Sequence, residues 1–379
     1  MFMLTRRRFL ETLSAGVTSG TLATTFAPGS SSTLKGKRVA MIHATDLYRP
    51  HMDPDDHWDL ACVFALAYSG DVELKGVLID FPPRGKKDVN PDVLAVSQMN
   101  FITGKKVPVT VGSSVAMRAR DDTQPDAAWS DHNGVRMVLD VLKSSANPVV
   151  INTTGSCRDI AIAGNREPKL FAEKCAGIYL NAGTGSPNRE KATKLEYNVT
   201  LDPLAYAAIF DLPCPVYWMP CFEAIEPQSE RRVMEYGTYY RFRQDAILPY
   251  LSDRMQKFFV YTLARMTSHN WLSYLMADCD PALVHQFGAS YRNMWCTGGF
   301  LHAAGYGVTS DGKIAPLGQV SNKTVFAFEP VRVACTKDGV TTWSRQKAET
   351  KRYIFQICDT DHYQSAMTKA IKALLVKLP

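Results

Sequence analysis

The chain contains no dense block of Lys or Arg, although 43 basic and 37 acidic side chains give it a formal net charge of +6. It therefore shows no sign of the basic stripe of nucleic-acid-binding proteins, and we expect no nucleic-acid partner. The nine cysteines include no Cys-x-x-Cys pair, so a zinc site is not expected. Their odd number also argues against a complete disulfide framework.

The N-terminal stretch lacks an apolar run that could span a membrane, because Glu11 and several Ser and Thr residues interrupt it. It carries three arginines and Phe-Leu at positions 6–10, followed by a weakly apolar segment up to about Ala27. This order is typical of a twin-arginine export signal, and a basic tail without a targeting role is the alternative. We expect residues 1–34 to be a signal peptide and linker, recognised by the twin-arginine translocase, and the protein to be periplasmic.

The remaining composition, with 46% hydrophobic and 21% charged residues in the whole chain, is that of a folded globular protein. Strand-like and helix-like patterns alternate along the chain. Strands are expected at 37–44, 77–79, 107–111, 148–152, 177–180 and 216–219, and helices at 57–68, 94–103, 135–144 and from 160. This alternation predicts an α/β fold with a mainly parallel open sheet and helices on both faces. No linker divides residues 35–379, so we expect one domain.

The last third of the chain has a different pattern. Residues 229–277 carry Arg, Tyr, Met and Leu at helical spacing, which predicts two or three helices packed over the sheet. Residues 323–358 look like a small β-rich addition with a turn at Asp338-Gly339. A closing helix is expected at about 363–377.

Three carboxylates cluster where the first strand ends and the first helix begins. Asp46 follows the strand, and Asp55 and Asp56 follow Pro54 directly before the apolar helical run. Ligands of open α/β sheets bind outside the carboxyl ends of the strands, and crowded carboxylates suit a hard cation. The alternative is a solvated acidic loop with helix-capping Asp residues, and the motif alone does not separate the two.

Two further polar segments follow later strands. Residues 152–156 read Asn-Thr-Thr-Gly-Ser, where the glycine permits a tight turn and a backbone carbonyl can face a ligand. Glu196 and Asn198 are two positions apart, so in an extended segment both side chains project to one face. A carboxylate beside an amide suits the hydroxyls of a sugar.

In order and spacing these three segments resemble the nucleoside hydrolase family of the inosine-uridine preferring type, and the chain looks like a divergent member. The stretches TDLYRPHMDPDDHWDLACVFALA, NTTGSCRDIAIA and LEYNVTLDP stand where the family has D-x-D-P-G-x-D-D with an apolar helix, P-T-G-G/P and E-F-N-x-x-x-D-P. The resemblance covers about residues 36–225. It implies a Rossmann-like nucleoside hydrolase fold.

The resemblance also implies a function, which is hydrolysis of the N-glycosidic bond of a ribonucleoside or related riboside with a bound Ca²⁺. Asp46 would be the base that activates the calcium-bound water. The ligands of the ion would be Asp46, Asp55, Asp56 and the carbonyl of Thr154. The sugar would be bound by Asp55, Glu196, Asn198 and, with an offset that differs from the family's, Asn188. Nearby carboxylates would stabilise the positive charge that forms on the sugar.

The chain departs from the family pattern in the first motif and near the C-terminal end. Asp46 and Asp55 are nine positions apart instead of the family's four, and a competing register uses Asp53 and Asp59. The family's late metal-binding Asp has two candidate positions: Asp280 matches in letters, whereas residues 293–300 look like a turn near the site but contain no acid.

The sequence offers several candidates for the groups that would bind or protonate the departing base. The candidates for the leaving-group acid are His51, His285 and His302. Trp295 is either a residue that stacks on the base or a core residue.

Two other functions are weighed against hydrolysis. A sugar- or nucleoside-binding protein that has lost turnover would share the cleft. A phosphatase of the haloacid dehalogenase type is disfavoured because Leu47-Tyr48, and not a second acid, follows Asp46. A homo-oligomer is possible.

Overall fold

The computed structural model describes residues 38–379 except for 84–85, 87, 189, 321–322 and 348–349. The expected export signal lies outside the described residues. All described residues belong to one contact unit, Thr33–Pro379.

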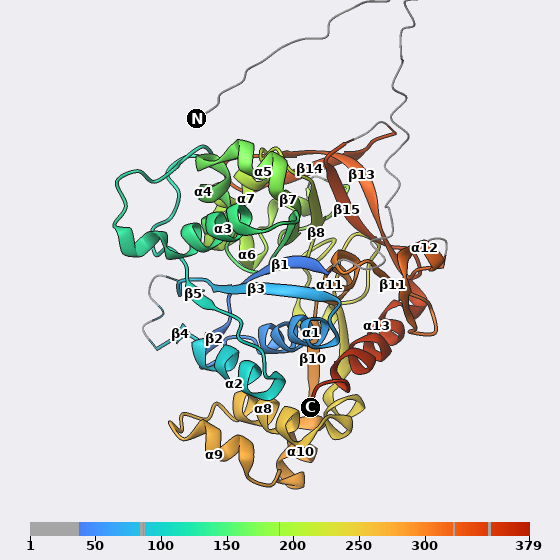
Figure 1. Ribbon diagram of the computed structural model, residues 1–379. Coiled ribbons are helices and arrows are strands. Elements are labelled where there is room, and N and C mark those ends of the chain that lie inside the picture. The colour runs from blue at the N-terminus through green and yellow to red at the C-terminus, as the bar shows by residue number, and fades with distance from the viewer. Residues whose placement is uncertain (1–37, 84–85, 87, 189, 321–322, 348–349) are drawn as a thin grey trace, which may run out of the picture. The chain divides into compact units, whose positions relative to one another are not determined.

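A nine-stranded sheet organises the described part of the chain (Figure 1). Its strand order is β14-β13-β15-β8-β7-β6-β1-β3-β5, and all neighbours from β15 to β5 are parallel. The strands are β1 (Val39–Thr45), β3 (Val72–Ile79), β5 (Val109–Val111), β6 (Val149–Thr153), β7 (Cys175–Asn181), β8 (Val216–Met219), β13 (Phe326–Cys335), β14 (Thr341–Arg345) and β15 (Arg352–Ile357). The predicted mainly parallel open sheet is confirmed.

Helices cover both faces of this sheet because the strand order reverses. The chain passes from β1 to β3 and β5 in one direction, and then from β6 to β7 and β8 in the other. Right-handed crossovers therefore place the two sets of helices on opposite faces. One set contains α1 (Asp55–Ser69) and α2 (Val93–Thr103), and the other contains α3 (Asn133–Ser144), α4 (Arg158–Arg166), α5 (Pro168–Lys174), α6 (Tyr197–Leu201) and α7 (Pro203–Ile209).

Strand β1 lies between two separate apolar cores. Ala40, Ile42 and Ala44 belong to the core on the α3 and α4 side, whereas Met41 belongs to the core on the α1 side. This alternation follows the two-residue period of a strand. Because both faces are covered, the strand is buried along most of its length, and apart from His43 its polar side chains fall at its carboxyl end.

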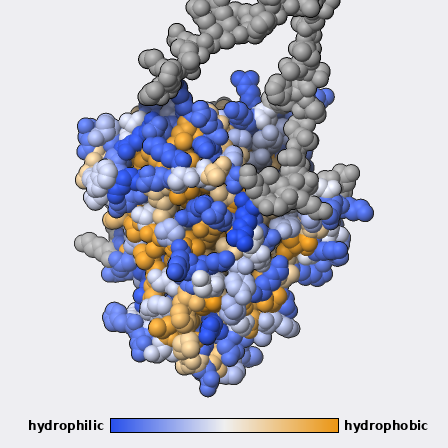
Figure 2. Space-filling model, in the orientation of Figure 1, coloured by the Kyte–Doolittle hydropathy of each residue, from blue (hydrophilic) through white to orange (hydrophobic). Residues whose placement is uncertain are grey.

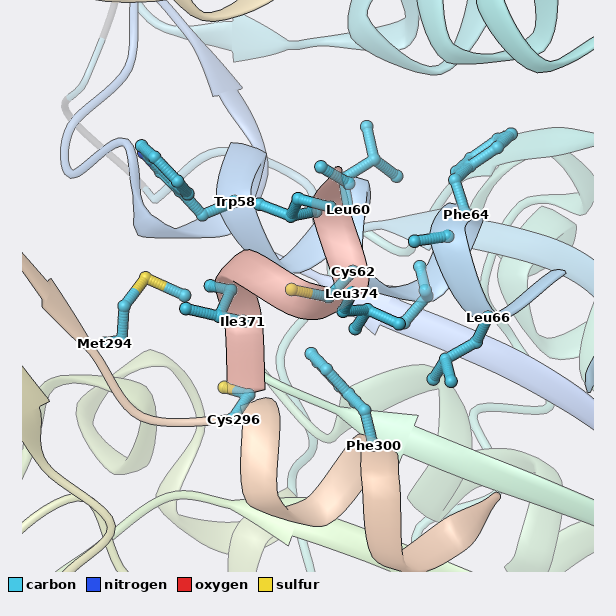
Figure 3. Close-up of a cluster of buried hydrophobic side chains, with 14 of the residues drawn as sticks. Trp58, Leu60, Cys62, Phe64, Leu66, Met294, Cys296, Phe300, Ile371 and Leu374 are labelled. Atoms are coloured by element: carbon cyan, nitrogen blue, oxygen red, sulfur yellow. The ribbon is translucent and has the colours of Figure 1, made fainter. Parts of the chain in front are cut away.

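Helix α1 is buried on almost every side. It begins after Pro54 and ends at Gly70, whose φ of 81° allows the left-handed cap. The closing helix α13 (Thr360–Leu375) and α11 (Thr297–Ala303) pack against it, and Figure 3 shows Ile371, Leu374 and Phe300 beside the α1 side chains. This packing fixes the first turn of α1, which carries Asp55 and Asp56.

The C-terminal third differs from the sequence expectation in part. Residues 240–243 form strand β9 (Tyr240–Arg243), which pairs with β10 (Tyr291–Met294), and only then do helices α8 (Asp253–Leu263) and α9 (Trp271–Met276) follow. The expected β-rich addition is present, and its strands extend the main sheet. The remaining elements are β2 (Tyr48–Arg49) with β4 (Asn90–Pro91), β11 (Tyr306–Val308) with β12 (Ile314–Pro316), α10 (Pro281–Gly288) and α12 (Leu317–Val320).

The surface is of mixed polarity on the face that Figure 2 shows, where apolar groups lie between hydrophilic ones. Among the described residues, none of the helices has both the length and the apolar character of a membrane span.

Candidate active site

A cavity of about 270 Å³ opens at the carboxyl ends of four adjacent strands. Asp46 follows β1, Thr154 follows β6, Asn181 ends β7 and Cys221 follows β8, and all four residues line the cavity. Strands β1 and β6 are neighbours at the point where the strand order reverses. The cavity therefore occupies the position at which open α/β sheets bind their ligands.

Four other parts of the chain complete the cavity wall. They are the loop before α1 together with the first turn of α1, the start of α6, a segment near positions 222–231, and residues 295–296. Their lining residues are Met52, Asp53, Asp55, Asp56, Glu196, Tyr197, Asn198, Phe222, Arg231, Trp295 and Cys296.

Three carboxylates crowd one end of the cavity. Asp55 and Asp56 occupy the first turn of α1, where the helix dipole favours negative charge, and the Thr45 hydroxyl donates to Asp56 at 2.8 Å. Burial raises the pKa of Asp46, Asp55 and Asp56, and the neighbouring acids raise the pKa of each further. Positive charge brought to this end would offset both effects.

Asp80 lies behind these acids at the end of β3. It is buried and accepts a hydrogen bond from the backbone N–H of Ser156, and burial raises its pKa to about 7. Gly155 is required here for space, because a Cβ would collide with the Asp80 carboxylate and lie 2.9 Å from the Asp46 nitrogen. The glycine of the Asn-Thr-Thr-Gly-Ser turn thus lets β6 approach two acids closely.

Glu196 and Asn198 line the cavity, but not from an extended segment as expected. Glu196 caps α6, with its carboxylate oxygens accepting from the N–H groups of Asn198 at 3.0 Å and Gly183 at 2.9 Å. A carboxylate that satisfies free N–H groups favours the start of a helix, which overrides the alternating pattern. Asn198 then donates to the carbonyls of Thr154 at 3.1 Å and Asn181 at 3.0 Å, which ties α6 to the ends of β6 and β7.

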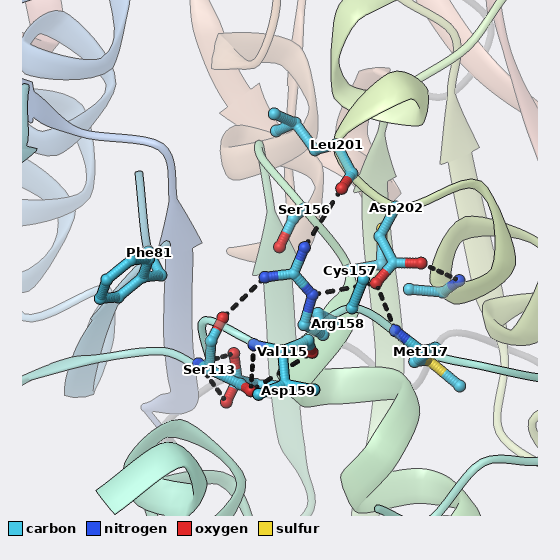
Figure 4. A network of polar contacts seen from close by, with 12 residues as sticks. Phe81, Ser113, Val115, Met117, Ser156, Cys157, Arg158, Asp159, Leu201 and Asp202 are labelled. Atoms are coloured by element: carbon cyan, nitrogen blue, oxygen red, sulfur yellow. Dashed lines mark hydrogen bonds and ion pairs between the residues drawn. The ribbon is translucent and has the colours of Figure 1, made fainter. Parts of the chain in front are cut away.

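A buried ion pair positions α6. Arg158 contacts Asp202 at 2.9 Å and donates to the carbonyls of Ser113 and Leu201 at 2.6 and 3.1 Å (Figure 4). Asp202 in turn caps α7 and accepts from the Met117 N–H at 2.9 Å. The sugar-binding candidates of α6 are therefore held by contacts outside the cavity.

The insertion in the first motif forms a side wall of the cavity. Its β2 pairs with β4, and Arg49 donates to the Tyr261 hydroxyl at 3.1 Å and the Met266 carbonyl at 3.0 Å. Asp53, which faces the cavity, forms an ion pair of 2.9 Å with Arg292. The longer spacing between Asp46 and Asp55 is thus accommodated by an anchored loop.

Three aromatic rings, those of Phe222, Trp295 and Tyr239, form an aromatic wall at the cavity. The ring centroids of Phe222, Trp295 and Tyr239 are each 5.8 Å from one another, and Phe222 and Trp295 line the cavity. Trp295 also packs against the larger apolar core. Trp295 therefore lies both at the cavity and against the core, and its stacking on a base stays a prediction.

Comparison with known proteins gives the family. The model of the inosine-uridine preferring nucleoside hydrolases matches residues 51–362. The chain belongs to this family. Its members act on N-glycosyl compounds, and the protein is a hydrolase of this class.

Solved structures of nucleoside hydrolases share the fold. A purine-preferring ribonucleoside hydrolase from Gardnerella vaginalis is 16% identical, with a TM-score of 0.53 over 89% of this chain and 99% of that one. The plant nucleoside hydrolase PpNRh1 is 15% identical, with a TM-score of 0.50 over 89% of this chain and all of its own. The effector protein XOO4466 is 14% identical, with a TM-score of 0.51 over 89% and 94% of the two chains. A search of curated protein sequences finds no match.

Most of the site residues expected of a nucleoside hydrolase meet in the cavity. Those that line it are Asp46, Asp55, Asp56, Thr154, Glu196, Asn198 and Trp295. Asp53 of the competing register also lines it, whereas Asp59 is buried and is not among the lining residues. The strand end and the first helical turn therefore both contribute acids.

Three expected residues lie elsewhere. Asp280 is exposed and caps α10, where it accepts from the Ala282 N–H at 2.8 Å. Asn188 is exposed, and its side chain accepts from the Glu190 N–H at 2.9 Å. His302 shares a hydrogen bond of 2.7 Å with the Tyr179 hydroxyl and is not a lining residue. These placements correct the expectations for all three.

The second candidate region for the late acid reaches the cavity instead. Trp295 and Cys296 line it, and the thiols of Cys296 and Cys221 both point to the Asn181 side-chain oxygen, at 3.2 and 3.5 Å. Asp280 matched only in letters, whereas the strand pair β9–β10 brings residues 295–296 to the site. This region therefore brings a thiol, and no acid, to the cavity.

The remaining acids and carbonyls suit a divalent cation in their chemistry. Asp46, Asp55, Asp56 and the Thr154 carbonyl offer oxygen, which Ca²⁺ and Mg²⁺ prefer. Within residues 38–379, gaps aside, no three His, Cys, Asp or Glu side chains already surround one point as ligands do. An ion would therefore have to draw these carboxylates together.

Several lining or supporting residues were not anticipated. Asp80 and Asn181 end apolar strands that the sequence did reveal, so asking which polar residue follows each strand would have found both. Cys221 and Arg231 follow no motif, and only the folded chain brings them to the cavity.

Proposed function

We propose that the protein hydrolyses the N-glycosidic bond of a ribonucleoside or related riboside, with Asp46 as the base that activates water. Family membership supports the reaction class. The observation that carries the proposal is the meeting of Asp46, Asp55 and Asp56 with Glu196 and Asn198 in one cavity.

The chemistry follows from these side chains. Asp46 takes a proton from the water that attacks the anomeric carbon, and a buried carboxylate with a raised pKa is a stronger base than an exposed one. The bond from the anomeric carbon to the base nitrogen breaks, and its electron pair stays on the base. Positive charge forms on the sugar ring, and the acids of the cavity stabilise it. Glu196 and Asn198 hold the sugar hydroxyls.

We further propose that the cavity binds Ca²⁺ through Asp46, Asp55, Asp56 and the Thr154 carbonyl. A bound divalent ion would polarise the attacking water and offset the crowded negative charge. Cys221 and Cys296 are softer ligands that suit Zn²⁺ better, so both ions belong in the test.

The decisive experiment replaces Asp46. Asp46→Asn should lower the rate at which the nucleobase is released from inosine or uridine by at least about a hundredfold. The substitution removes the carboxylate that accepts the proton of the attacking water but keeps the size of the side chain. Asp280→Asn is the matched control, because it changes an exposed helix cap outside the cavity and should leave the rate unchanged. An Asp46→Asn enzyme with the original rate would contradict the role of Asp46.

A sugar- or nucleoside-binding protein without turnover is the second candidate. The family's late metal-binding Asp has no counterpart among the described residues that line the cavity, because Asp280 lies outside it and residues 295–296 contain no acid. Calorimetry with nucleosides, run beside an assay for free ribose, separates the two. Nucleoside binding without sugar release would favour the second candidate.

We also propose that residues 1–34 direct export through the twin-arginine translocase, on the basis of the arginines and the apolar segment behind them. Replacing Arg7 and Arg8 by Lys should move the protein from the periplasmic to the cytoplasmic fraction. Equal fractionation of the variant and the original chain would contradict export by this route.

A further inference from the structure

One positively charged side chain lines the cavity. Among its lining residues only Arg231 is basic, and five are acids: Asp46, Asp53, Asp55, Asp56 and Glu196. Asp53 already has Arg292 as its ion-pair partner, whereas Arg231 forms no ion pair within the described part of the chain. The Nε of Arg231 is buried and has no hydrogen-bond partner there. A guanidinium in this setting is available to a ligand.

Arg231 belongs to the aromatic wall. Its guanidinium carbon lies 4.9 Å from the ring centroid of Phe222, which stands edge to face with Trp295. Phe222 follows β8, and β8 is three strands away from β1, so the two strand ends are about 14 Å apart at the usual strand spacing. A riboside with its sugar at the acids would therefore place its flat base against Phe222, Trp295 and Arg231.

The reaction needs a group at this end. When the glycosidic bond breaks, the electron pair leaves a negative charge on the base nitrogen. None of the expected proton donors supplies this need, because His51, His285 and His302 are not lining residues. Arginine does not release its proton at neutral pH, but its N–H groups form charge-assisted hydrogen bonds to an anion.

We propose that Arg231 binds the departing base and stabilises its negative charge, so that the base leaves as an anion and takes a proton from water afterwards. The attacking water gives its proton to Asp46, and its oxygen forms the new bond to the anomeric carbon. Arg231 is then a catalytic residue of the leaving group, acting by charge and not by proton transfer. The inference rests on the proposed hydrolysis of ribosides.

The test compares substrates whose leaving groups differ in how strongly they depend on stabilisation of their negative charge. Uridine and inosine release a basic anion, whereas a nitrophenyl riboside releases a phenolate that is stable without assistance. Arg231→Met should lower kcat/KM on uridine and inosine about a hundredfold and on the nitrophenyl riboside less than tenfold. Arg231→Lys keeps a positive charge but loses the planar guanidinium. Its kcat/KM on uridine and inosine should lie between the values of the original enzyme and of Arg231→Met.

A matched control and a pH profile sharpen the test. Arg232→Met alters the neighbouring side chain, which is exposed and contacts Glu226 at 3.5 Å outside the cavity, and it should leave both rates unchanged. Because a guanidinium does not titrate in the accessible range, kcat/KM for uridine should not fall as the pH rises from about 7 to 8, whatever increase the deprotonation of Asp46 adds. A histidine acid would instead lose activity over that range.

The outcomes separate this inference from the function on which it rests. If the original enzyme hydrolyses neither nucleosides nor the nitrophenyl riboside, the proposed function fails and the role of Arg231 fails with it. If it hydrolyses both and Arg231→Met lowers both equally, or neither, the role of Arg231 is overturned and the hydrolase stands. Thermal unfolding of Arg231→Met and Arg231→Lys checks the fold, and either variant alone decides the comparison.

Discussion

Asp59 shows what burial does to a single acid beside the cavity. It lies in α1 with 1% of its surface exposed, and neither carboxylate oxygen has a hydrogen-bond partner among the described residues. Burial raises its pKa to about 7. Its protonated form is therefore favoured in the folded protein, and ionisation opposes folding.

The consequence is a stability that depends on pH. The pKa of Asp59 is higher in the folded than in the unfolded protein. Protonated Asp59 therefore adds its full contribution to the free energy of unfolding below about pH 4, and this contribution is lost as the pH rises through 7. Asp59→Asn should thus raise the free energy of unfolding by about 2–4 kcal/mol at pH 8 and by little at pH 4. Denaturant titrations with a chelator present measure this difference. Asp280→Asn should shift both values equally, and a pH-independent effect of Asp59→Asn would contradict the argument.

Single residues were predictable where a local rule fixes them. Asp46 ends an apolar strand, and Asp55 and Asp56 start a helix, so their meeting follows from the order of elements alone. Asp280 also precedes a helix, and the same local rule made it a cap and not a ligand. Cys296 and Arg231 reach the cavity through contacts between distant segments, which no local pattern encodes.

Elements were predictable where burial is continuous. The parallel strands and α1 are mostly apolar and buried, so their pattern can be recognised from the local sequence alone. The segment from Glu196 to Asn198 became a helix because Glu196 caps it, and residues 240–243 became a strand because β10 pairs with them. In the first case one capping carboxylate, and in the second a strand distant in the sequence, determined a structure that the local pattern did not predict.

The ion pair of Arg158 links several elements at once, and its loss should be felt in all of them. Arg158→Met leaves Asp202 buried without its charge partner, so the free energy of unfolding should fall by about 3–5 kcal/mol. The variant should also raise the KM for nucleosides, because α6 carries Glu196 and Asn198. Lys143→Met removes an exposed ion pair with Glu167 and should cost about 1 kcal/mol or less. Equal losses for the two variants, by denaturant titration, would refute the positioning role.

At the scale of the whole molecule, the reversal of strand order decides where chemistry takes place. It opens the sheet edge between β1 and β6, where the acids and the Thr154 carbonyl lie, and the cavity extends from there to the aromatic wall that follows β8. Repulsion between the three crowded carboxylates of Asp46, Asp55 and Asp56 opposes folding, and a bound cation would offset it. Stability and ion binding should therefore be linked.

This linkage can be measured directly. Treatment with a chelator should lower the melting temperature, and Ca²⁺ at about a hundred times its dissociation constant should restore roughly 5 °C or more. The double variant Asp55→Asn with Asp56→Asn should melt at the same temperature with and without Ca²⁺. Asp253→Asn with Asp311→Asn, which removes two exposed acids, should keep the full response. Recovery with Zn²⁺ but not Ca²⁺ would instead point to the thiols of Cys221 and Cys296.

The packing of α13 on α1 joins the two ends of the described chain. Until the last sixteen-residue helix has been synthesised, the apolar side chains of α1 that it covers have no partner. The core beneath Asp55 and Asp56 therefore cannot be completed before residues 360–375 have left the ribosome. The acids proposed to bind the ion should take up their places only after α13 has folded, and a chain truncated before residue 360 should remain a substrate for chaperones and proteases.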